Sequence, residues 1–224
     1  MTRAANGTYR GTTTDERREQ RRRRLLDAAL EIVGTQGLAA LTVRGLCEQA
    51  KVGPRFFYES FTDLDALATD LLDEVQGVAL EHAAAAMTDT PGDPETKIRA
   101  GVAALIIAVT DDPRRAQIAF AQAYGSELLM RRRFEGMRQV AQLIIDQTRV
   151  LLDLPDSDDT ALTAVAQLIT GGAAELILVW LDGGLKVERP LLIEIVADYV
   201  VAMVDRLPGI SEKLGGGTAL PTGD

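Results

Sequence analysis

The sequence predicts an all-α protein of about nine helices, with a small N-terminal domain of three helices ahead of a larger helical domain. Long segments carry apolar residues at helical spacing and are separated by Gly, Pro and Asp breaks, and no segment alternates polar and apolar residues as a strand would. Hydrophobic residues make up 46% of the chain and aromatic residues only 4%. Such a composition, dominated by Ala and Leu, is typical of a helical core.

The first predicted helix, from about Thr14 to Gln36, has a strongly basic first half. Its apolar positions begin at Leu25. The residues ahead of them include Arg17, Arg18, Arg21, Arg22, Arg23 and Arg24. Like charges at one end of a helix repel one another and oppose its positive N-terminus, so exposed arginines here favour binding to an anion such as a phosphate backbone. The alternative is an ordinary solvated face.

Residues 42–61 predict two short helices joined by a tight turn, the layout of a helix-turn-helix DNA-binding element. Thr42 suits the N-cap of the first helix, which runs to about Ala50. Gly53 suits the turn, and Pro54 suits the first position of the second helix. On that second helix Phe57 and Phe61 are four apart and are expected to face the core. The positions on or beside the outward face are Arg55, Phe56, Tyr58, Glu59 and Ser60.

Charge is segregated along the chain. Residues 1–61 contain eleven Lys and Arg against seven Asp and Glu, a net charge of +4. The remaining residues contain thirteen against twenty-six, a net charge of −13, and together these give the −9 of the whole chain. An acidic protein with its positive charge gathered at one end can bind nucleic acid there and stay soluble.

These residues resemble the N-terminal DNA-binding domain of TetR-family transcriptional regulators over about residues 16 to 68. The motifs that carry the resemblance are Thr42-Val43-Arg44, the turn at Val52-Gly53, Tyr58 to Phe61, and Asp65-Ala66-Leu67. The resemblance implies a three-helix reading head, a fourth helix that links it to an all-α effector domain, and a homodimer that binds a roughly palindromic double-stranded operator.

The chain departs from the family at two positions. Lys51-Val52-Gly53 stands where Gly-Val-Ser is frequent, so the second helix lacks a serine cap. Leu64 stands where the family usually places a lysine that contacts phosphate. One phosphate contact is therefore expected to be missing.

Roles on DNA can be assigned to individual side chains. The resemblance implies that Arg44 and Tyr58 contact phosphates, and Lys51 at the turn suits the same role. Arg55 can donate to guanine O6 and N7. Phe56 either packs on a thymine methyl group or joins the core, and Glu59 either accepts from a cytosine amino group or pairs with an arginine. The full set expected at the DNA is Thr42, Arg44, Lys51, Pro54, Arg55, Phe56, Tyr58, Glu59, Ser60 and Arg22.

The larger domain is predicted as amphipathic helices separated by clear breaks. A linking helix over 62–87, capped by Thr62 or Asp63, is long enough to connect two domains. Further helices are predicted at 94–110, 113–124, 126–152, 158–181 and 189–207. The chain then divides into a disordered arm (1–12), a DNA-binding domain (13–61), a ligand-binding and dimerisation domain (62–207) and a flexible tail (208–224).

Two glycines, Gly171 and Gly172, lie inside the predicted helix 158–181, where each costs about 1 kcal/mol relative to alanine. Close approach of another helix is the usual benefit, and the last two helices resemble the pair that forms the family's dimer interface. The resemblance implies a subunit contact through Leu168, Gly171, Gly172, Leu176, Val179, Val196 and Val200. Alternatively, the glycines relieve crowding within one subunit or mark a kink.

The resemblance also implies a ligand cavity among the fourth to eighth helices. The residues expected to contact a ligand are Phe120, Tyr124, Met137, Phe134, Gln117 and Trp180, each of which also suits core packing. Because such walls are mostly apolar, the expected effector is a hydrophobic small molecule. The arginine run at 131–133 is expected to be a solvated face.

Other kinds of chemistry are not indicated by the sequence. Cys47 is the only cysteine and His82 the only histidine, so no disulfide, metal site, cofactor or catalytic group is expected. Without a signal peptide or a long apolar run, we expect a cytoplasmic protein with no membrane contact.

The sequence therefore predicts a ligand-responsive DNA-binding regulator, a repressor that leaves its operator when the effector binds. An all-α interaction module whose arginine segment binds an acidic partner is the alternative. A helical enzyme is the third reading, but the acidic pairs at 111–112 and 158–159 look like helix caps, so we expect no enzyme.

Overall fold

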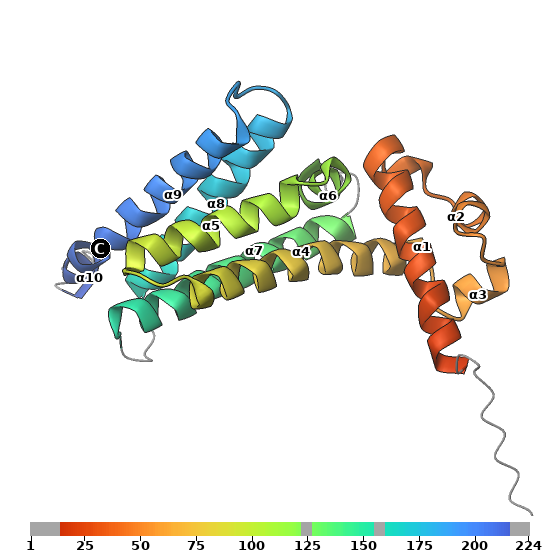
Figure 1. Cartoon of the computed structure of the whole chain (residues 1–224), viewed down its shortest axis with the longest axis horizontal. Coiled ribbons are helices and arrows are strands. Elements are labelled where there is room, and N and C mark those ends of the chain that lie inside the picture. The colour runs from red at the N-terminus through yellow and green to blue at the C-terminus, as the bar shows by residue number, and fades with distance from the viewer. Residues whose placement is uncertain (1–13, 122–126, 155–159, 216–224) are drawn as a thin grey trace, which may run out of the picture.

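The computed structural model describes residues 14–121, 127–154 and 160–215, and within these ranges every regular element is helical (Figure 1), which confirms the all-α prediction. The elements are α1 (Thr14–Gln36), η1 (Leu38–Ala40), α2 (Val43–Ala50), α3 (Pro54–Tyr58), α4 (Leu64–Asp89), α5 (Pro94–Thr110), α6 (Pro113–Ala116), η2 (Gln117–Ala121), α7 (Glu127–Leu152), α8 (Thr160–Leu181), α9 (Arg189–Asp205) and α10 (Leu207–Gly215).

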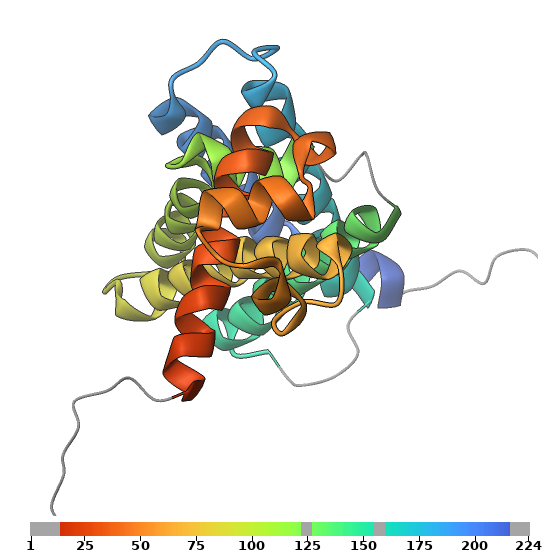
Figure 2. The same cartoon turned by 90° about the vertical axis from the view of Figure 1, so that its right-hand side faces the viewer.

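Helices α1 to α3 form a small unit at one end of the elongated molecule (Figures 1 and 2). Its core is built from side chains that are almost wholly inaccessible, among them Leu25 on α1, Leu46 on α2 and Phe57 on α3. The sequence placed these apolar residues at helical spacing, so each short helix has one face to bury. We call this unit, residues 14–61, the reading head.

Helix α4 leaves the reading head and runs the length of the larger part of the molecule, beside α5 and α7 (Figure 1). It begins at Leu64 because the carboxylate of Asp63 accepts from the Ala66 amide at 2.7 Å. Helices α8 and α9 form the opposite edge (Figure 1). Arg99 on α5 holds α9 through Glu194 at 3.2 Å and Asp198 at 2.6 Å.

The structure corrects two boundaries of the predicted elements. The single helix expected at 113–124 is instead the short helix α6 followed by a π-helical turn, η2, up to Ala121. The flexible tail was expected from residue 208, but Leu207 is buried and begins α10, which packs on α8. The predicted arm, 1–12, lies outside the described residues.

One described helix, α8, has the length and apolar composition that would allow it to cross a membrane. Core helices of soluble proteins share these properties, and α8 contributes seven buried residues to the fold, including Ile169 and Ile177. We therefore treat α8 as a helix of the core.

Candidate nucleic-acid interface and ligand cavity

In the turn between α2 and α3, the unusual backbone conformation is adopted by a different residue from the one predicted. Thr42 caps α2 as expected, its hydroxyl accepting from the Gly45 amide at 3.1 Å. The left-handed residue is Lys51, with φ 52°, whereas Gly53 has an ordinary extended conformation with φ −66°. Lys51 therefore occupies the position where the family often has glycine. As expected, no side chain caps α3.

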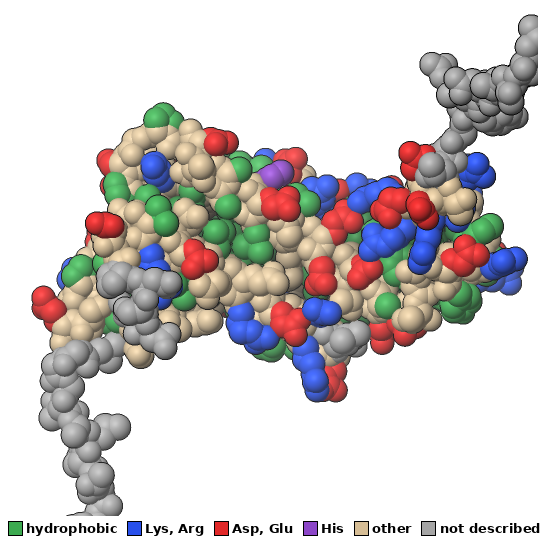
Figure 3. Space-filling view, turned by 90° about the horizontal axis from the view of Figure 1, so that it is seen from below, with side chains coloured by type: hydrophobic (Ala, Val, Ile, Leu, Met, Phe, Trp, Pro, Cys, Tyr) green, Lys and Arg blue, Asp and Glu red, His purple; other side chains and the backbone are tan. Residues whose placement is uncertain are grey.

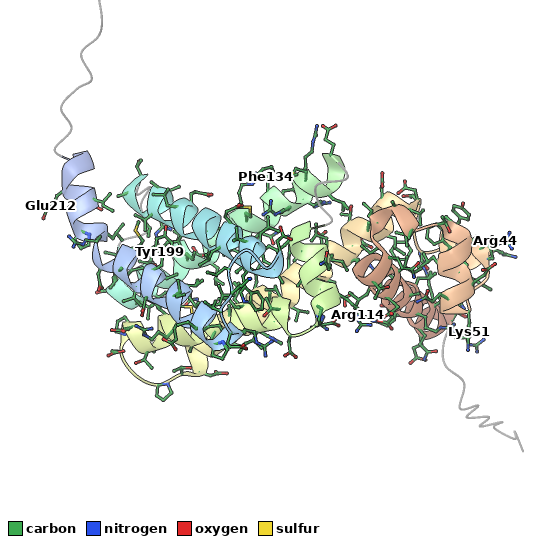
Figure 4. All side chains as sticks on the ribbon, turned by 90° about the horizontal axis from the view of Figure 1, so that it is seen from above. Arg44, Lys51, Arg114, Phe134, Tyr199 and Glu212 are labelled. Atoms are coloured by element: carbon green, nitrogen blue, oxygen red, sulfur yellow. The ribbon has the colours of Figure 1, made fainter. Side chains whose placement is uncertain are left out.

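Helix α3 buries one face and presents the other to solvent at the tip of the molecule. Phe57 and Phe61 enter the core with ring centroids 5.9 Å apart. On the outward side, the Arg55 side chain is 88% exposed and Tyr58 is 62% exposed. Arg44 and Lys51 project outward at the same end of the molecule (Figure 4). Four groups that can donate hydrogen bonds thus share one accessible end.

Glu59 pairs with arginines rather than standing free. Its carboxylate lies 3.4 Å from Arg55 and 3.8 Å from Arg21, and its main-chain carbonyl accepts from Arg18 at 2.7 Å. Of the two interpretations of Glu59, ion pairing is the one the structure shows. Its neighbour Phe56 is partly exposed, with the Arg21 guanidinium 4.4 Å from its ring centroid, so Phe56 is not a core residue.

Several arginines of α1 find carboxylates within the chain, which corrects the expectation that they need an external anion. Arg22 donates to Asp70 on α4 at 2.7 Å, and Arg23 pairs with Asp27 and Glu74. The pKa of Arg23 is raised by these hydrogen bonds. Lys and Arg side chains gather over this end of the molecule with acidic side chains among them (Figure 3). These arginines hold α1 against α4, and part of the positive charge is neutralised.

Leu64, the position where the family usually has a lysine, begins α4 and packs against the core cluster. An aliphatic side chain cannot donate to a phosphate oxygen. Leu64 therefore cannot make the phosphate contact that a lysine makes at this position in the family.

Arg114 on α6 joins the reading head to the larger part of the molecule (Figure 4). Its guanidinium donates to Glu31 on α1 at 2.6 Å and to Asp112 at 2.7 Å. The hydrogen bonds from Arg114 lower the pKa of the Asp112 carboxyl. A Cβ at Gly34 would lie 2.7 Å from the Cα of Arg114, far inside normal contact, so α1 and α6 touch through their backbones.

A cavity of about 170 Å³ lies between α4, α5, η2, α7, α8 and α9. Most of its lining is aliphatic, with Phe120 from η2 and Met137 from α7 among the larger side chains. The polar side chains that line it are Gln76, Arg133, Gln147, Thr148 and Thr170. None of the described lining residues is acidic. The cavity is therefore apolar with one cationic side chain.

The predicted ligand residues divide into two groups. Phe120 and Met137 line the cavity, whereas Gln117 is exposed and does not. Trp180 also lies outside the lining, because its indole N–H donates to the Val187 carbonyl at 2.8 Å. Phe134 is 50% exposed and points away from the helical bundle (Figure 4). Tyr124 lies outside the described residues.

The sequence missed Arg133 as a lining residue. Expected as part of a solvated face, it is only 8% exposed and lines the cavity, while its apolar neighbour Phe134 faces solvent. Apolar residues on both sides of α7 left its inward face ambiguous in the sequence. The arginine had no recognisable signal.

Helices α8 and α9 carry several large apolar side chains that are exposed in the single chain. On α8, Leu168 is 60% exposed and Val179 is also exposed, while Leu176 is half-buried. On α9 the exposed large apolar residues are Leu191, Ile195 and Tyr199, spaced four apart. We call these five exposed residues, Leu168, Val179, Leu191, Ile195 and Tyr199, the α8–α9 face.

The sequence predicts that Val196 and Val200 contact a partner subunit, but in the structure they do not reach the surface of the chain. Both are buried and line the cavity. Because α9 is apolar on two sides, periodicity alone did not distinguish its inward face from its outward face. Ile195 and Tyr199 take the outward positions.

Gly171 and Gly172 do not relieve crowding within one chain. A Cβ at Gly171 would have no atom within 4 Å, and one at Gly172 would be in ordinary contact with the Tyr199 hydroxyl at 3.5 Å. Both glycines lie among the exposed apolar residues of α8. Relief of crowding within one chain is therefore excluded as the reason for these glycines.

No group of three His, Cys, Asp or Glu side chains among the described residues is arranged to hold a metal ion. Cys47 is buried in the reading head, where burial raises the pKa of its thiol. His82 is exposed on α4.

Comparison with known structures shows that the fold is shared with regulators. A TetR-family regulator from Syntrophomonas wolfei is 12% identical, with a TM-score of 0.72 over 92% of this chain and 99% of that one. FadR from Bacillus subtilis, solved in complex with stearoyl-CoA, is 14% identical, with a TM-score of 0.62 over 83% of this chain and 96% of that one. A transcriptional regulator from Pseudomonas aeruginosa PAO1 is 18% identical, with a TM-score of 0.69 over 86% of this chain and 94% of that one.

No curated protein matches the sequence. Residues 25–71 match the family model of the bacterial regulatory proteins, tetR family. The matched segment holds the apolar half of α1, α2, the turn, α3 and the start of α4, so it covers most of the reading head but not the arginine-rich first half of α1. The N-terminal part of the chain is therefore similar to the DNA-binding domain of the tetR family, and the all-α fold as a whole is similar to that of solved regulators of this family.

Proposed function

We propose that the chain is a homodimeric repressor that binds a roughly palindromic operator and is released from it by a hydrophobic small molecule. The observation that carries this proposal is the exposed face of α3, with Arg55 and Tyr58 accessible at the tip of the reading head. A short helix presented in this way fits the major groove. The protein acts in the cytoplasm, where the DNA is.

Each side chain at the tip has a role on DNA in this proposal. Arg55 donates to a guanine edge once it exchanges its pairing with Glu59 for the base. Tyr58, Arg44 and Lys51 contact phosphates and fix the register, because they lie around α3 and are exposed. Thr42 caps α2, Pro54 begins α3, and Ser60 follows the end of α3, where its hydroxyl donates to the Phe56 carbonyl at 3.3 Å. All three border the same surface.

Arg22 and Glu59 have supporting rather than direct roles. Arg22 is held by Asp70 and lies over the Phe61 ring, so it positions α1 on α4. Glu59 gathers Arg55 and Arg21, which orders their guanidinium groups before DNA arrives. Phe56, stacked under Arg21, is accessible to a thymine methyl group.

The dimer forms through the α8–α9 face. Exposed apolar residues on two neighbouring helices lose contact with water when an identical face covers them, and two helices from each chain give a four-helix contact. The open space at Gly171 and the exposed Gly172 let the partner's helices come close. Two reading heads are then available for two half-sites.

Release depends on the connection between the cavity and the reading head. Ala119 and Phe120 of η2 line the cavity, and η2 continues directly from α6, where Arg114 binds Glu31 of α1. A ligand that fills the cavity displaces η2 and α6, and so changes the position of α1 and the separation of the two heads. FadR, solved with stearoyl-CoA, supports the capacity of this fold to hold an apolar chain.

The alternative, a module whose arginine segment binds an acidic partner, is less well supported. Arg18, Arg21, Arg22 and Arg23 already have partners within the chain. Arg44 and Arg55 also pair, with Glu48 and Glu59 on their own segments, but they remain exposed. Together with Lys51 they lie at α2, α3 and their turn, which is the geometry of a DNA reader.

Gel-shift titration of the purified protein against fragments upstream of its own gene tests the proposal. One fragment should bind specifically, and the logarithm of the binding constant should fall steeply with the logarithm of salt concentration, since phosphate contacts release counterions. Operator DNA should also weaken effector binding by the factor by which effector weakens DNA binding. Absence of specific binding to any genomic fragment would overturn the proposal.

A further inference from the structure

The cavity has a polar end that its apolar lining does not explain. Arg133 on α7 is 8% exposed and lines the cavity, whereas the next residue, Phe134, is half exposed to solvent. A helix that served only the core would bury the phenyl ring and expose the guanidinium, because burial of a charge is costly and burial of an aromatic ring is favourable. The reversed arrangement therefore indicates a use for a positive charge inside.

Gln76 on α4 lies at the same end of the cavity as Arg133. Arg132 pairs with Asp73 at 3.9 Å, which aligns this part of α7 with this part of α4. The side-chain amide of Gln76 packs directly against Gly136, where a Cβ would collide with it. Gly136 thus makes the room that the Gln76 amide occupies. Both polar side chains line the cavity, and Gln76 makes no hydrogen bond with any described residue.

Away from this end, the cavity is long and mostly aliphatic, and its remaining polar side chains, Gln147, Thr148 and Thr170, carry no charge. Its lining on α7 extends from Arg133 to Leu151, which at 1.5 Å per residue spans roughly 27 Å. On α4 it extends from Gln76 to Met87, roughly 16 Å. With a volume of about 170 Å³, a cavity of this length is narrow. It fits an unbranched chain better than a compact ring system.

The charge of the lining selects among head groups. Arg133 is cationic, and no Asp or Glu occurs among the described residues that line the cavity. A cationic head would be repelled here, and a neutral head would gain no charge-assisted hydrogen bond from the guanidinium. A carboxylate or phosphate can accept two parallel N–H bonds from a guanidinium and a further bond from the Gln76 amide.

We infer that the effector is a linear amphiphile with an anionic head, bound with its carboxylate or phosphate at Arg133 and Gln76 and its aliphatic chain along α4, α5 and α7. This inference rests on the proposed function only in taking the cavity as the effector site. It names the chemical class of the effector and the residue that selects it.

The test is calorimetric titration of the full chain, without DNA, with dodecanoate, dodecyl phosphate, 1-dodecanol and dodecylammonium, each below its critical micelle concentration. At least one of the two anions should bind tenfold or more tightly than the alcohol, and the cation should bind weakest. The tighter of the two anions identifies the head group. Equal binding of anion and alcohol, preferred binding of the cation, or no binding of any chain would overturn the inference.

Variants locate the selectivity. Arg133→Met should lose tenfold or more in anion affinity while its affinity for 1-dodecanol is kept, and Arg133→Lys should keep the anion preference. The matched control is Arg138→Gln, which removes the same charge from an exposed position on the same helix and should change nothing. An Arg133→Met protein that still prefers the anion would contradict the role of Arg133.

If Arg133→Met does not fold, as judged by circular dichroism, the head-group series on the unaltered protein and on Arg133→Lys decides the question. The two proposals fail separately in this design. Loss of head-group preference leaves DNA binding untouched, whereas a protein that binds the anion but no genomic DNA would overturn the proposed function alone.

Discussion

The contact between α1 and α6 gives a prediction whose size follows from the structure. In Gly34→Ala the new Cβ would lie 2.7 Å from the Cα of Arg114 and nearer still to its Cβ, against about 3.4 Å for an ordinary close contact, so the two helices must separate by at least about 0.7 Å. These two atoms, the Cα and Cβ of Arg114, are fixed by the backbone and cannot rotate away. Such overpacking costs roughly 1–3 kcal/mol.

Alanine in place of a helical glycine also contributes a gain, of about 1 kcal/mol. Gly77→Ala on α4 isolates that gain, because a Cβ there has no atom within 4 Å. The free energy of unfolding should therefore rise by about 1 kcal/mol in Gly77→Ala, and the value for Gly34→Ala should be roughly 1–3 kcal/mol below that of the control. For a chain of this size each kcal/mol corresponds to about 2–4 °C in Tm.

The assay is urea unfolding of both variants, together with their affinity for the operator. Gly34→Ala should be the less stable variant, and its operator affinity should change, because α1 carries the reading head. If Gly34→Ala is as stable as the Gly77→Ala control and binds the operator with unchanged affinity, both the close backbone contact and the route from the cavity to DNA through α6 are refuted.

Three further predictions concern the interface, the dimer and pH. Arg55→Ala should weaken operator binding by about 1–3 kcal/mol and relax preference at one base position per half-site, as measured by binding to a set of operator variants; a loss equal for all sequences would make Arg55 a phosphate contact. Leu168→Glu should give a monomer in sedimentation equilibrium, while Val150→Glu, at an exposed apolar position on α7, should leave the dimer intact; dimerisation of both would contradict the α8–α9 face. Hydrogen bonds from Arg114 lower the pKa of Asp112 below its ordinary 3.8, so this pairing stabilises the fold above about pH 4 and the contribution is lost as pH falls through the lower, folded-state pKa. Asp112→Asn should flatten the fall in unfolding free energy between pH 5 and pH 2, and an unaltered slope would exclude this assignment.

The reading head could be predicted from the sequence in detail because its signals are local. The cap at Thr42, the start of α3 at Pro54 and the burial of Phe57 and Phe61 depend on residues within one or two turns of each other. The left-handed conformation of Lys51 was not predicted, because lysine has no preference for that conformation and the nearby Gly53 does.

The cavity could be predicted only as a region, because its walls depend on how long helices turn against one another. The sequence of α7 places Arg133 beside Phe134, and only packing shows that the arginine faces inward. On α9, Ile195 and Val196 are equally apolar, so periodicity did not show which of them faces the cavity and which faces solvent. Tertiary contacts decide such positions.

The arginines of α1 show a third limit. Their number predicted an anion nearby, but not that Asp70 and Glu74 on α4 would supply part of it. Partners that are about fifty positions away in the chain leave no local pattern. The arginines do pair with anionic groups, but only the folded structure shows that these groups are carboxylates of α4.

The most direct test of the account is a nuclease footprint of the protein on the genomic fragment that it binds. Two exposed α3 helices in one dimer should protect two half-sites related by approximate two-fold symmetry, with centres one helical turn, about 34–36 Å, or a multiple of it apart. Tyr58→Phe should weaken protection at both half-sites alike. A single asymmetric protected segment, or protection that is unaffected when the α3 face is altered, would contradict the claim that α3 carries the protein onto DNA.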